Sequence, residues 1–489
     1  MSESILNREE LLNQTKIEDQ RSDLKQHADK MLRDFEKFNN FSSNRAIWEL
    51  VQNACDLSVN CEITIDYRFG KIAFSHNGKP FETKSLISLI KQVSGKYGDQ
   101  EDIPEVGKYG TGFLTTHTFG RKFTIQSVLK TGDFFLPIND FEIDRSPKTW
   151  ELLSDKIAIQ KGLVYEIIEK ESAIDVNEFK TTFTYTPESD TEKEYVRVSS
   201  LDLDEYIPLV FTVNQRLSKI TVISSLGEES TYRRVSKERV DNVKGINLYK
   251  TVIATTQEEK WIYSLVEEDD AIEIILPVNK EHDVFEFSDR VARLFLYYPL
   301  VGSEDFGINF LINCNKFLPN EPRSGIHLSS NKDQVKEQEE ANRLIVDKST
   351  DLIFEFLKSN IIEVSSPLLY ANVSFKTNTE DSILNEYFEA LQQRWNKELS
   401  SLPFVKTASG YKEVQEVVFF HEELIADKES DLKTIYQIAS KYYENIPVIE
   451  DVLKWSIYAN NWNDDDIQFI NHHDLLTKTS EDDLGAFNK

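Results

Sequence analysis

The sequence has few sulfur-containing residues and no long apolar run. It contains three cysteines and two methionines in 489 residues. The spacing of Cys55, Cys61 and Cys314 matches no metal-binding motif and does not allow a disulfide framework. We find no run of about 18 apolar residues, and the first twenty residues lack the apolar core of a signal peptide. We therefore expect a cytoplasmic protein without membrane contact.

Basic residues are also scarce compared with acidic ones. Lysine and arginine total 56, aspartate and glutamate total 84, and the formal net charge is −28. A field of this sign repels phosphate backbones, so broad nucleic-acid binding is not expected unless a local basic patch exists. Hydrophobic residues make up 40% of the chain, which is enough for sizeable cores in two to four domains.

The hydrophobic patterns predict an α+β protein, because helices and strands are partly segregated along the chain. Strands are expected at CEITIDYRF, KIAFSHN, KFTIQSVL, FFLPI, LVYEIIE, FKTTFTYTP, KITVISS, VIATT, FGINFLINC and VQEVVFF, and helices at SLISLIKQVS and at 332–360, 381–397 and 430–443. The expected division is a helical N-terminal arm at 1–40, a first domain at 41–200, an α/β middle domain at 201–365 and a mixed, largely helical region at 366–489.

The most informative element is the helix expected at 43–58. Its apolar residues Ile47, Leu50, Val51 and Ala54 recur at helical spacing and predict one buried face. Glu49, Asn53 and Asp56 follow at i, i+4 and i+7, so they form a polar stripe beside that face. For this helix alone, a ligand site and a stripe that simply faces water are both open.

Two further motifs follow this helix. Ser75-His76-Asn77-Gly78-Lys79-Pro80-Phe81 comes directly after a strand, and its Asn-Gly pair is also typical of a plain hairpin turn. The second motif is Gly107-Lys108-Tyr109-Gly110-Thr111-Gly112-Phe113. Its glycines would let backbone N–H groups approach a phosphate, although it is not a P-loop, which would end in Gly-Lys-Ser/Thr.

In this order and at this spacing, the three motifs resemble those of the GHKL ATPase superfamily. That group includes the gyrase B subunit, MutL proteins, histidine kinases, MORC proteins and the ninety-kilodalton heat-shock chaperones. The resemblance covers about residues 40–125, and ELVQNACD and NGKPF look most like the sacsin-type ATP-binding module. It implies a Bergerat-type α/β sandwich that binds ATP with Mg²⁺, followed by a transducer-like middle domain.

The resemblance also implies residue roles. Glu49 would be the general base for the attacking water, Asn53 the Mg²⁺ ligand, and Asp56 a contact near the base or sugar. The segment 84–106 would be a lid. The other implied nucleotide contacts are His76 and Gly78 at the turn, Lys96 and Lys108 as phosphate contacts, and Gly107, Gly110, Thr111, Gly112 and Phe113 around the phosphates.

Two positions depart from the family's pattern, and one further role falls to the middle domain. In the family an aspartate accepts a hydrogen bond from the adenine amino group, and His76 stands there; Pro80 replaces a second glycine. Adenine is expected, and another purine or loose selection stays open, because a neutral imidazole has only one acceptor nitrogen. A buried histidine that only bonds to the backbone is the other interpretation of His76. From the middle domain, Arg323 would contact the γ-phosphate, with Lys316 and Lys332 as alternatives, because arginine presents a planar fork to phosphate oxygens.

The expected activity is slow, Mg²⁺-dependent ATP hydrolysis coupled to lid closure, conformational change or dimerisation, in the manner of chaperones, with an unidentified protein partner or client. The alternative is a nucleotide-gated binding module, in a bacterial defence or DNA-associated system, in which ATP acts as a switch ligand. A histidine kinase is not favoured, because no phospho-acceptor helical hairpin precedes the first domain.

Overall fold

The computed structural model divides the chain into two compact units. Unit 1 comprises residues 1–237, 251–260 and 296–301, and unit 2 comprises residues 238–250, 261–295 and 302–489. The structure describes residues 8–36, 42–92, 112–176, 178–243, 246–269, 271–320, 324–330, 333–359, 367–376, 380–425, 429–462 and 467–479. The division into four segments that the sequence predicts, at 1–40, 41–200, 201–365 and 366–489, stays a prediction.

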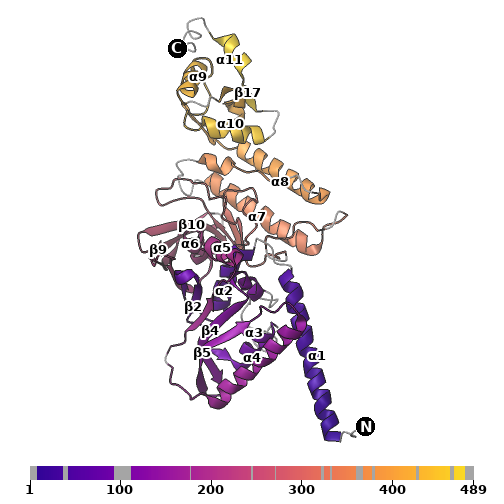
Figure 1. Ribbon diagram of the computed structural model, residues 1–489. Coiled ribbons are helices and arrows are strands. Elements are labelled where there is room, and N and C mark those ends of the chain that lie inside the picture. The colour runs from indigo at the N-terminus through magenta and orange to yellow at the C-terminus, as the bar shows by residue number, and fades with distance from the viewer. Residues whose placement is uncertain are drawn as a thin grey trace. The chain divides into compact units, whose positions relative to one another are not determined.

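Unit 1 combines a mixed sheet with helices (Figure 1). Its helices are α1 (Arg8–Glu36), α2 (Ser42–Asp56), α3 (Thr83–Lys91), α4 (Trp150–Lys170), α5 (Asp190–Ser199) and α6 (Leu203–Val213), with the 3-10 helices η1 (Arg68–Gly70) and η2 (Gly112–Phe119). Its strands are β1 (Cys61–Asp66), β2 (Ile72–His76), β3 (Phe81–Glu82), β4 (Lys122–Thr131), β5 (Phe134–Asp144), β6 (Thr181–Tyr185) and β7 (Leu217–Ile223).

The sheet of unit 1 runs in the order β7-β1-β2-β6-β4-β3, and β5 pairs with β4. Strand β1 is parallel to β7 and antiparallel to β2, with Ile63 opposite His76, and His76 in turn lies opposite Thr181 of β6. Along β1, Cys61, Ile63 and Ile65 are buried and alternate with more exposed residues, as the period of a strand requires.

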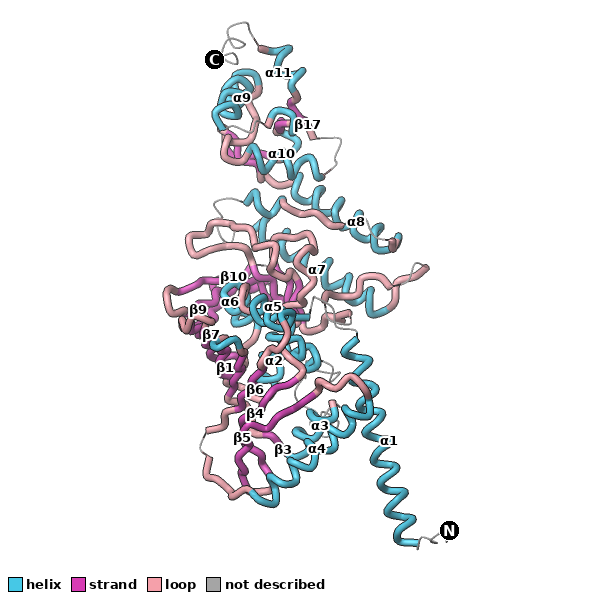
Figure 2. The backbone as a smooth tube through the Cα atoms, in the orientation of Figure 1, coloured by secondary structure: helices cyan, strands magenta, loops and turns pink. Residues whose placement is uncertain are grey.

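Helices cover this sheet. Helix α2 contacts β1 and η2, α3 contacts β4, and α4 contacts β5. In Figures 1 and 2, α1 lies beside α4. Only the second half of α1 is buried, through Ala28, Met31 and Phe35. The predicted arm is thus a helix whose C-terminal half packs on the first unit.

One predicted strand is wrong. The segment LVYEIIE, read as β because of its branched residues, forms the last part of α4. The buried residues of α4 are Leu153, Ile157, Gln160 and Val164, at the three- and four-residue spacing of a helix. Packing of this face overrides the weak strand preference of isoleucine and valine.

Three long strands, β8 (Glu229–Val243), β9 (Ile246–Ala254) and β10 (Glu259–Glu267), begin in one unit and end in the other. Unit 2 then contains a sheet in the order β10-β11-β13-β12, and Trp395 of α8 is fully buried between Phe310 and Phe354. The elements of this sheet and its helices are β10 (Glu259–Glu267), β11 (Ile272–Ile275), β12 (Leu294–Phe295), β13 (Leu311–Cys314), α7 (Glu337–Ser359), the 3-10 helix η3 (Pro367–Ala371) and α8 (Ser382–Ser400).

The C-terminal part of unit 2 mixes helices with short strands, and its apolar core includes Ile438, Ala439 and Ile470. Its elements are β14 (Val405–Thr407), β15 (Gly410–Lys412), η4 (Val414–Glu416), β16 (Val418–Phe420), η5 (Glu422–Leu424), α9 (Glu429–Tyr442), α10 (Val452–Asn461), β17 (Gln468–Ile470) and α11 (His472–Lys478). The mixed sheets and their helices confirm the predicted α+β class.

Candidate nucleotide site

Helix α2 carries the predicted site residues beside a buried face. Ile47, Leu50, Val51 and Ala54 are all almost fully buried, which confirms the predicted apolar face. Glu49 is also buried, with 6% of its surface exposed, whereas Asn53 and Asp56 are half-buried. The stripe of polar residues therefore does not simply face water, and its first member lies inside the protein.

Glu49 pairs with Arg45 one turn earlier on α2. The Arg45 guanidinium donates two hydrogen bonds to Glu49 Oε1, from Nη2 at 2.7 Å and from Nε at 3.1 Å. A buried carboxylate is tolerated only when it is paired, because removal from water strongly disfavours an isolated charge. Arg45 was missed in the sequence analysis, although an i, i+4 pair of opposite charges on a helix is a readable signal.

The last glycine of the glycine motif lies against Glu49. A Cβ atom built on Gly112 would overlap Glu49 Oε2, so only glycine lets the backbone come this close. Gly112 begins η2, in which Thr115 Oγ1 donates to the Gly112 carbonyl at 2.7 Å and Thr116 Oγ1 donates to the Phe113 carbonyl at 2.7 Å. The structure thus brings Glu49 and Gly112 together.

A buried arginine holds η2 from the other side. Arg145 is 1% exposed, and its Nη1 lies 2.8 Å from Gln92 Oε1 and 3.0 Å from His117 Nε2 of η2, while Nη2 donates to the Leu89 carbonyl. Burial lowers the pKa of Arg145 to about 10. Arg145 therefore connects the end of α3 to η2. No local sequence pattern predicts this long-range contact.

The turn after β2 packs at the C-terminal end of α2. The Gly78 N–H donates to His76 Nδ1 at 3.0 Å, and the Lys79 N–H donates to the Leu57 carbonyl at 3.2 Å. A Cβ on Gly78 would lie 2.8 Å from both His76 Nδ1 and Leu57 Cβ, so this glycine is also required by a close approach. His76 is 4% exposed, and burial lowers its pKa to about 4, which keeps the imidazole neutral near pH 7.

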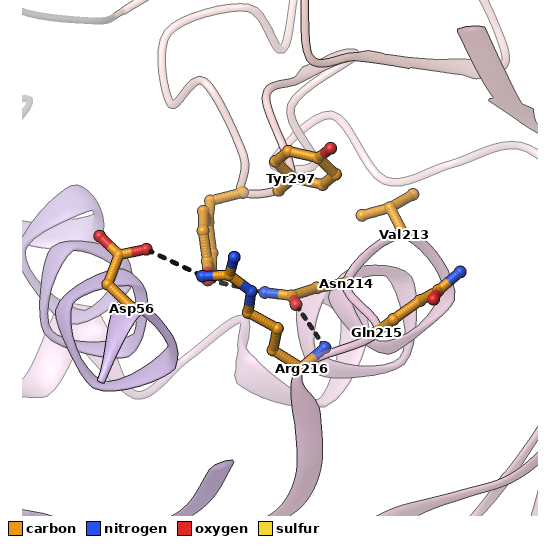
Figure 3. A pocket seen from close by; sticks show the side chains of 7 residues that line it. Asp56, Val213, Asn214, Gln215, Arg216 and Tyr297 are labelled. Atoms are coloured by element: carbon orange, nitrogen blue, oxygen red, sulfur yellow. Dashed lines mark hydrogen bonds and ion pairs between the residues drawn. The ribbon is translucent and has the colours of Figure 1, made fainter. Parts of the chain in front are cut away.

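Asp56 lines a pocket of about 300 Å³ within unit 1 (Figure 3). Among the described lining residues it is the one that the sequence analysis predicted; the others are Val213, Asn214, Gln215, Arg216, Tyr297 and Tyr298. Arg216 Nη1 lies 3.7 Å from Asp56 Oδ1, and Asn214 Nδ2 donates to the Tyr298 hydroxyl at 2.6 Å. The ion pair places Asp56 beside Arg216, the residue just before β7, a contact that the sequence analysis did not foresee.

Asn53 suits a cation bound partly by other oxygen donors. Its side chain lies one turn beyond Glu49 and makes no hydrogen bond to any described residue. An amide oxygen is a ligand that Mg²⁺ accepts together with phosphate oxygens and waters. Over the described ranges, no group of three or more His, Cys, Asp or Glu side chains is arranged to hold a metal ion.

Several predicted site residues lie outside the described residues: Lys96, Gly107, Lys108, Gly110, Thr111, Arg323 and the alternative Lys332. Phe113 is described, and its ring contacts Phe123 and Phe183 at centroid distances of 5.7 and 5.6 Å. Lys316, in unit 2, donates to the Asp269 carbonyl at 3.0 Å.

Comparisons with known proteins give weak likenesses. No protein-family model and no curated protein matches the chain. Among solved structures, the ATPase region of Saccharomyces cerevisiae topoisomerase II is similar at a TM-score of 0.25 and 14% identity, covering 43% of this chain and 58% of that one. The same region bound to ICRF-187 (dexrazoxane) gives 0.24 and 13%, with the same coverage. Likenesses of this size say nothing about activity.

Within the described part of the chain, we find no helix with the length and apolarity to cross a membrane.

Replacement of Gly112 by alanine tests the contact with Glu49. The added methyl group would force the carboxylate away from Arg45, so we expect Gly112→Ala to lower the free energy of unfolding by about 1–3 kcal/mol. The matched control is Gly162→Ala in α4, where a Cβ meets nothing within 4 Å. That variant should gain about 0.5–1 kcal/mol through helix propensity. Urea denaturation measures both; equal effects would contradict the contact.

The two buried histidines predict acid sensitivity. The pKa of His76 falls from 6.5 to about 4 through burial, and that of His117 falls well below 6.5 through burial and the nearby Arg145. As the pH falls, the histidines of the unfolded chain take up protons before those of the folded chain. The contribution of the buried histidines to the free energy of unfolding is therefore fully present above pH 6.5 and is lost toward pH 4, by about 3 kcal/mol for His76 alone. Urea midpoints across this range should shift less in His76→Asn than in wild type. The exposed control, His473→Asn, should leave the slope unchanged.

Proposed function

We propose that this chain binds ATP with Mg²⁺ in a GHKL-type site on α2 and hydrolyses it slowly. The observation that carries the proposal is the buried Glu49 carboxylate, held by Arg45 and covered by the backbone of Gly112. A carboxylate placed in this way has a fixed orientation and little contact with bulk water. Such a group suits general-base work on a single water molecule.

In this proposal the residues divide the work along α2. Glu49 accepts the proton of the attacking water, and Arg45 keeps the Glu49 side chain in one rotamer through two hydrogen bonds. Asn53 supplies an amide oxygen to the cation. When bound, Mg²⁺ would neutralise charge on the phosphate oxygens. The backbone at Gly112 is close enough to Glu49 to bring phosphate oxygens near this carboxylate.

Lid closure, conformational change and dimerisation are proposed from the resemblance to the GHKL superfamily. Nucleotide binding would drive lid closure and a change of conformation or dimerisation, as in sacsin-type and chaperone-like modules. The second candidate is a nucleotide-gated binding module of a DNA-associated or defence system, in which ATP hydrolysis is incidental.

The long Asp56–Arg216 ion pair supports this second candidate, because a ligand in the adjacent pocket could rearrange a pair at 3.7 Å.

Replacement of Glu49 by glutamine separates binding from hydrolysis. Glutamine keeps the size and an acceptor for Arg45 but is not a base, so phosphate release should fall by roughly 10²-fold or more. ATP affinity, measured by calorimetry with Mg²⁺, should change less than about tenfold. Glu62→Gln on β1, an exposed carboxylate, should leave both quantities unchanged. Unaltered turnover in Glu49→Gln would remove Glu49 from the mechanism.

The same preparation distinguishes the two candidates. If ATP compacts the wild-type chain in small-angle scattering and phosphate is released, hydrolysis is part of the cycle. Compaction of wild type and Glu49→Gln alike, with no phosphate release from either, would select the binding module. Failure of ATP to bind at all would eliminate both.

A further inference from the structure

The turn with His76 lies at the C-terminal end of α2, and Glu49 lies in the middle of this helix. The turn that carries His76 touches Leu57, just past the end of α2, whereas Glu49 lies about 12 Å earlier along the helix axis. The His76 ring also stacks on Phe183, and Phe183 contacts Phe113, the residue after Gly112. A ligand with its phosphates at Glu49 and Gly112 would therefore place its base toward His76.

The hydrogen-bonding role of His76 is fixed by the backbone. A peptide N–H can only donate, and the Gly78 N–H lies 3.0 Å from His76 Nδ1, so Nδ1 must be the acceptor. Rotation of the ring by 180° would replace this nitrogen with a carbon and break the bond. Since burial keeps the ring neutral near pH 7, its single proton resides on Nε2.

The Nε2–H is available to a ligand. Nε2 makes no hydrogen bond to any described residue. It is also not among the fully buried polar atoms without a partner, in contrast to His117 Nδ1. The small exposed part of the His76 side chain therefore includes this nitrogen. The group that His76 offers outward is one hydrogen-bond donor and no acceptor.

We infer that His76 is a specificity-determining residue that donates a hydrogen bond to the base, and that the site takes a 6-oxopurine triphosphate at least as tightly as ATP. This inference rests on the proposed function. Guanine and hypoxanthine present the acceptor O6 at position 6, whereas adenine presents an amino donor there. An amino group facing Nε2–H would set two donors against each other, and an unmatched buried donor is disfavoured.

The test uses ATP and ITP as a matched pair, because they differ at the 6-position and in the protonation of N1. Dissociation constants with Mg²⁺ are measured by calorimetry for the full chain, with GTP as a second 6-oxopurine. Wild type should bind ITP as tightly as ATP or more tightly. The variants His76→Asp and His76→Asn are isosteric, and each keeps an oxygen to accept from Gly78 N–H. His76→Asn can still donate outward, but the His76→Asp carboxylate can only accept.

The expected result is a preference for ATP in His76→Asp that exceeds the preference in His76→Asn by roughly tenfold. An ATP/ITP ratio that is the same in both variants, or a tenfold preference of wild type for ATP, would overturn the role of His76 and leave triphosphate binding standing. Absence of binding to every triphosphate would instead refute the proposed function. If either variant does not fold, as circular dichroism would reveal, the wild-type ratio decides alone.

Discussion

The buried carboxylate of Glu49 is the constraint on which the site depends. An ionised carboxylate inside a protein needs a partner, and Arg45, one helical turn earlier, supplies it on the same helix. The other carboxylate oxygen faces the backbone of Gly112, where no side chain fits. The position of η2 is therefore tied to the rotamer of one glutamate, and the apolar face of α2 must be buried for that rotamer to be enclosed.

A second buried charge, the Arg145 guanidinium, helps to position η2. The Arg145 guanidinium contacts no described carboxylate; its partners are Gln92, His117 and the Leu89 carbonyl. A buried cation with neutral partners is disfavoured by desolvation, as the lowered pKa of Arg145 indicates. The planar guanidinium nevertheless joins the end of α3 to η2 with hydrogen bonds in fixed directions. Burial of Arg145 therefore lowers stability but positions η2.

Local sequence patterns predicted the parts of the site that lie on one element. The spacing of Ile47 and Leu50 identified the buried face of α2, and the position of Glu49 beside that face followed from helical geometry. Tertiary contacts were not predictable in this way. Arg145 lies far from α2 in the sequence, and the Arg216 partner of Asp56 comes from the start of β7. The strand predicted inside α4 failed for the same reason, since packing decided its conformation.

Two glycines allow the backbone, rather than side chains, to form part of this site. Gly112 brings backbone against Glu49, and Gly78 brings backbone against Leu57 and the His76 ring, so main chain approaches α2 at its middle and just past its C-terminal end. Backbone N–H groups recognise phosphate without regard to the base. In the proposed nucleotide site, discrimination between bases would rest with the few side chains near the ligand, and the acceptor nitrogen of His76 is already bonded to the Gly78 N–H. The Gly78 N–H thus leaves His76 with a donor, Nε2–H, as the one ring group that it could offer to a ligand.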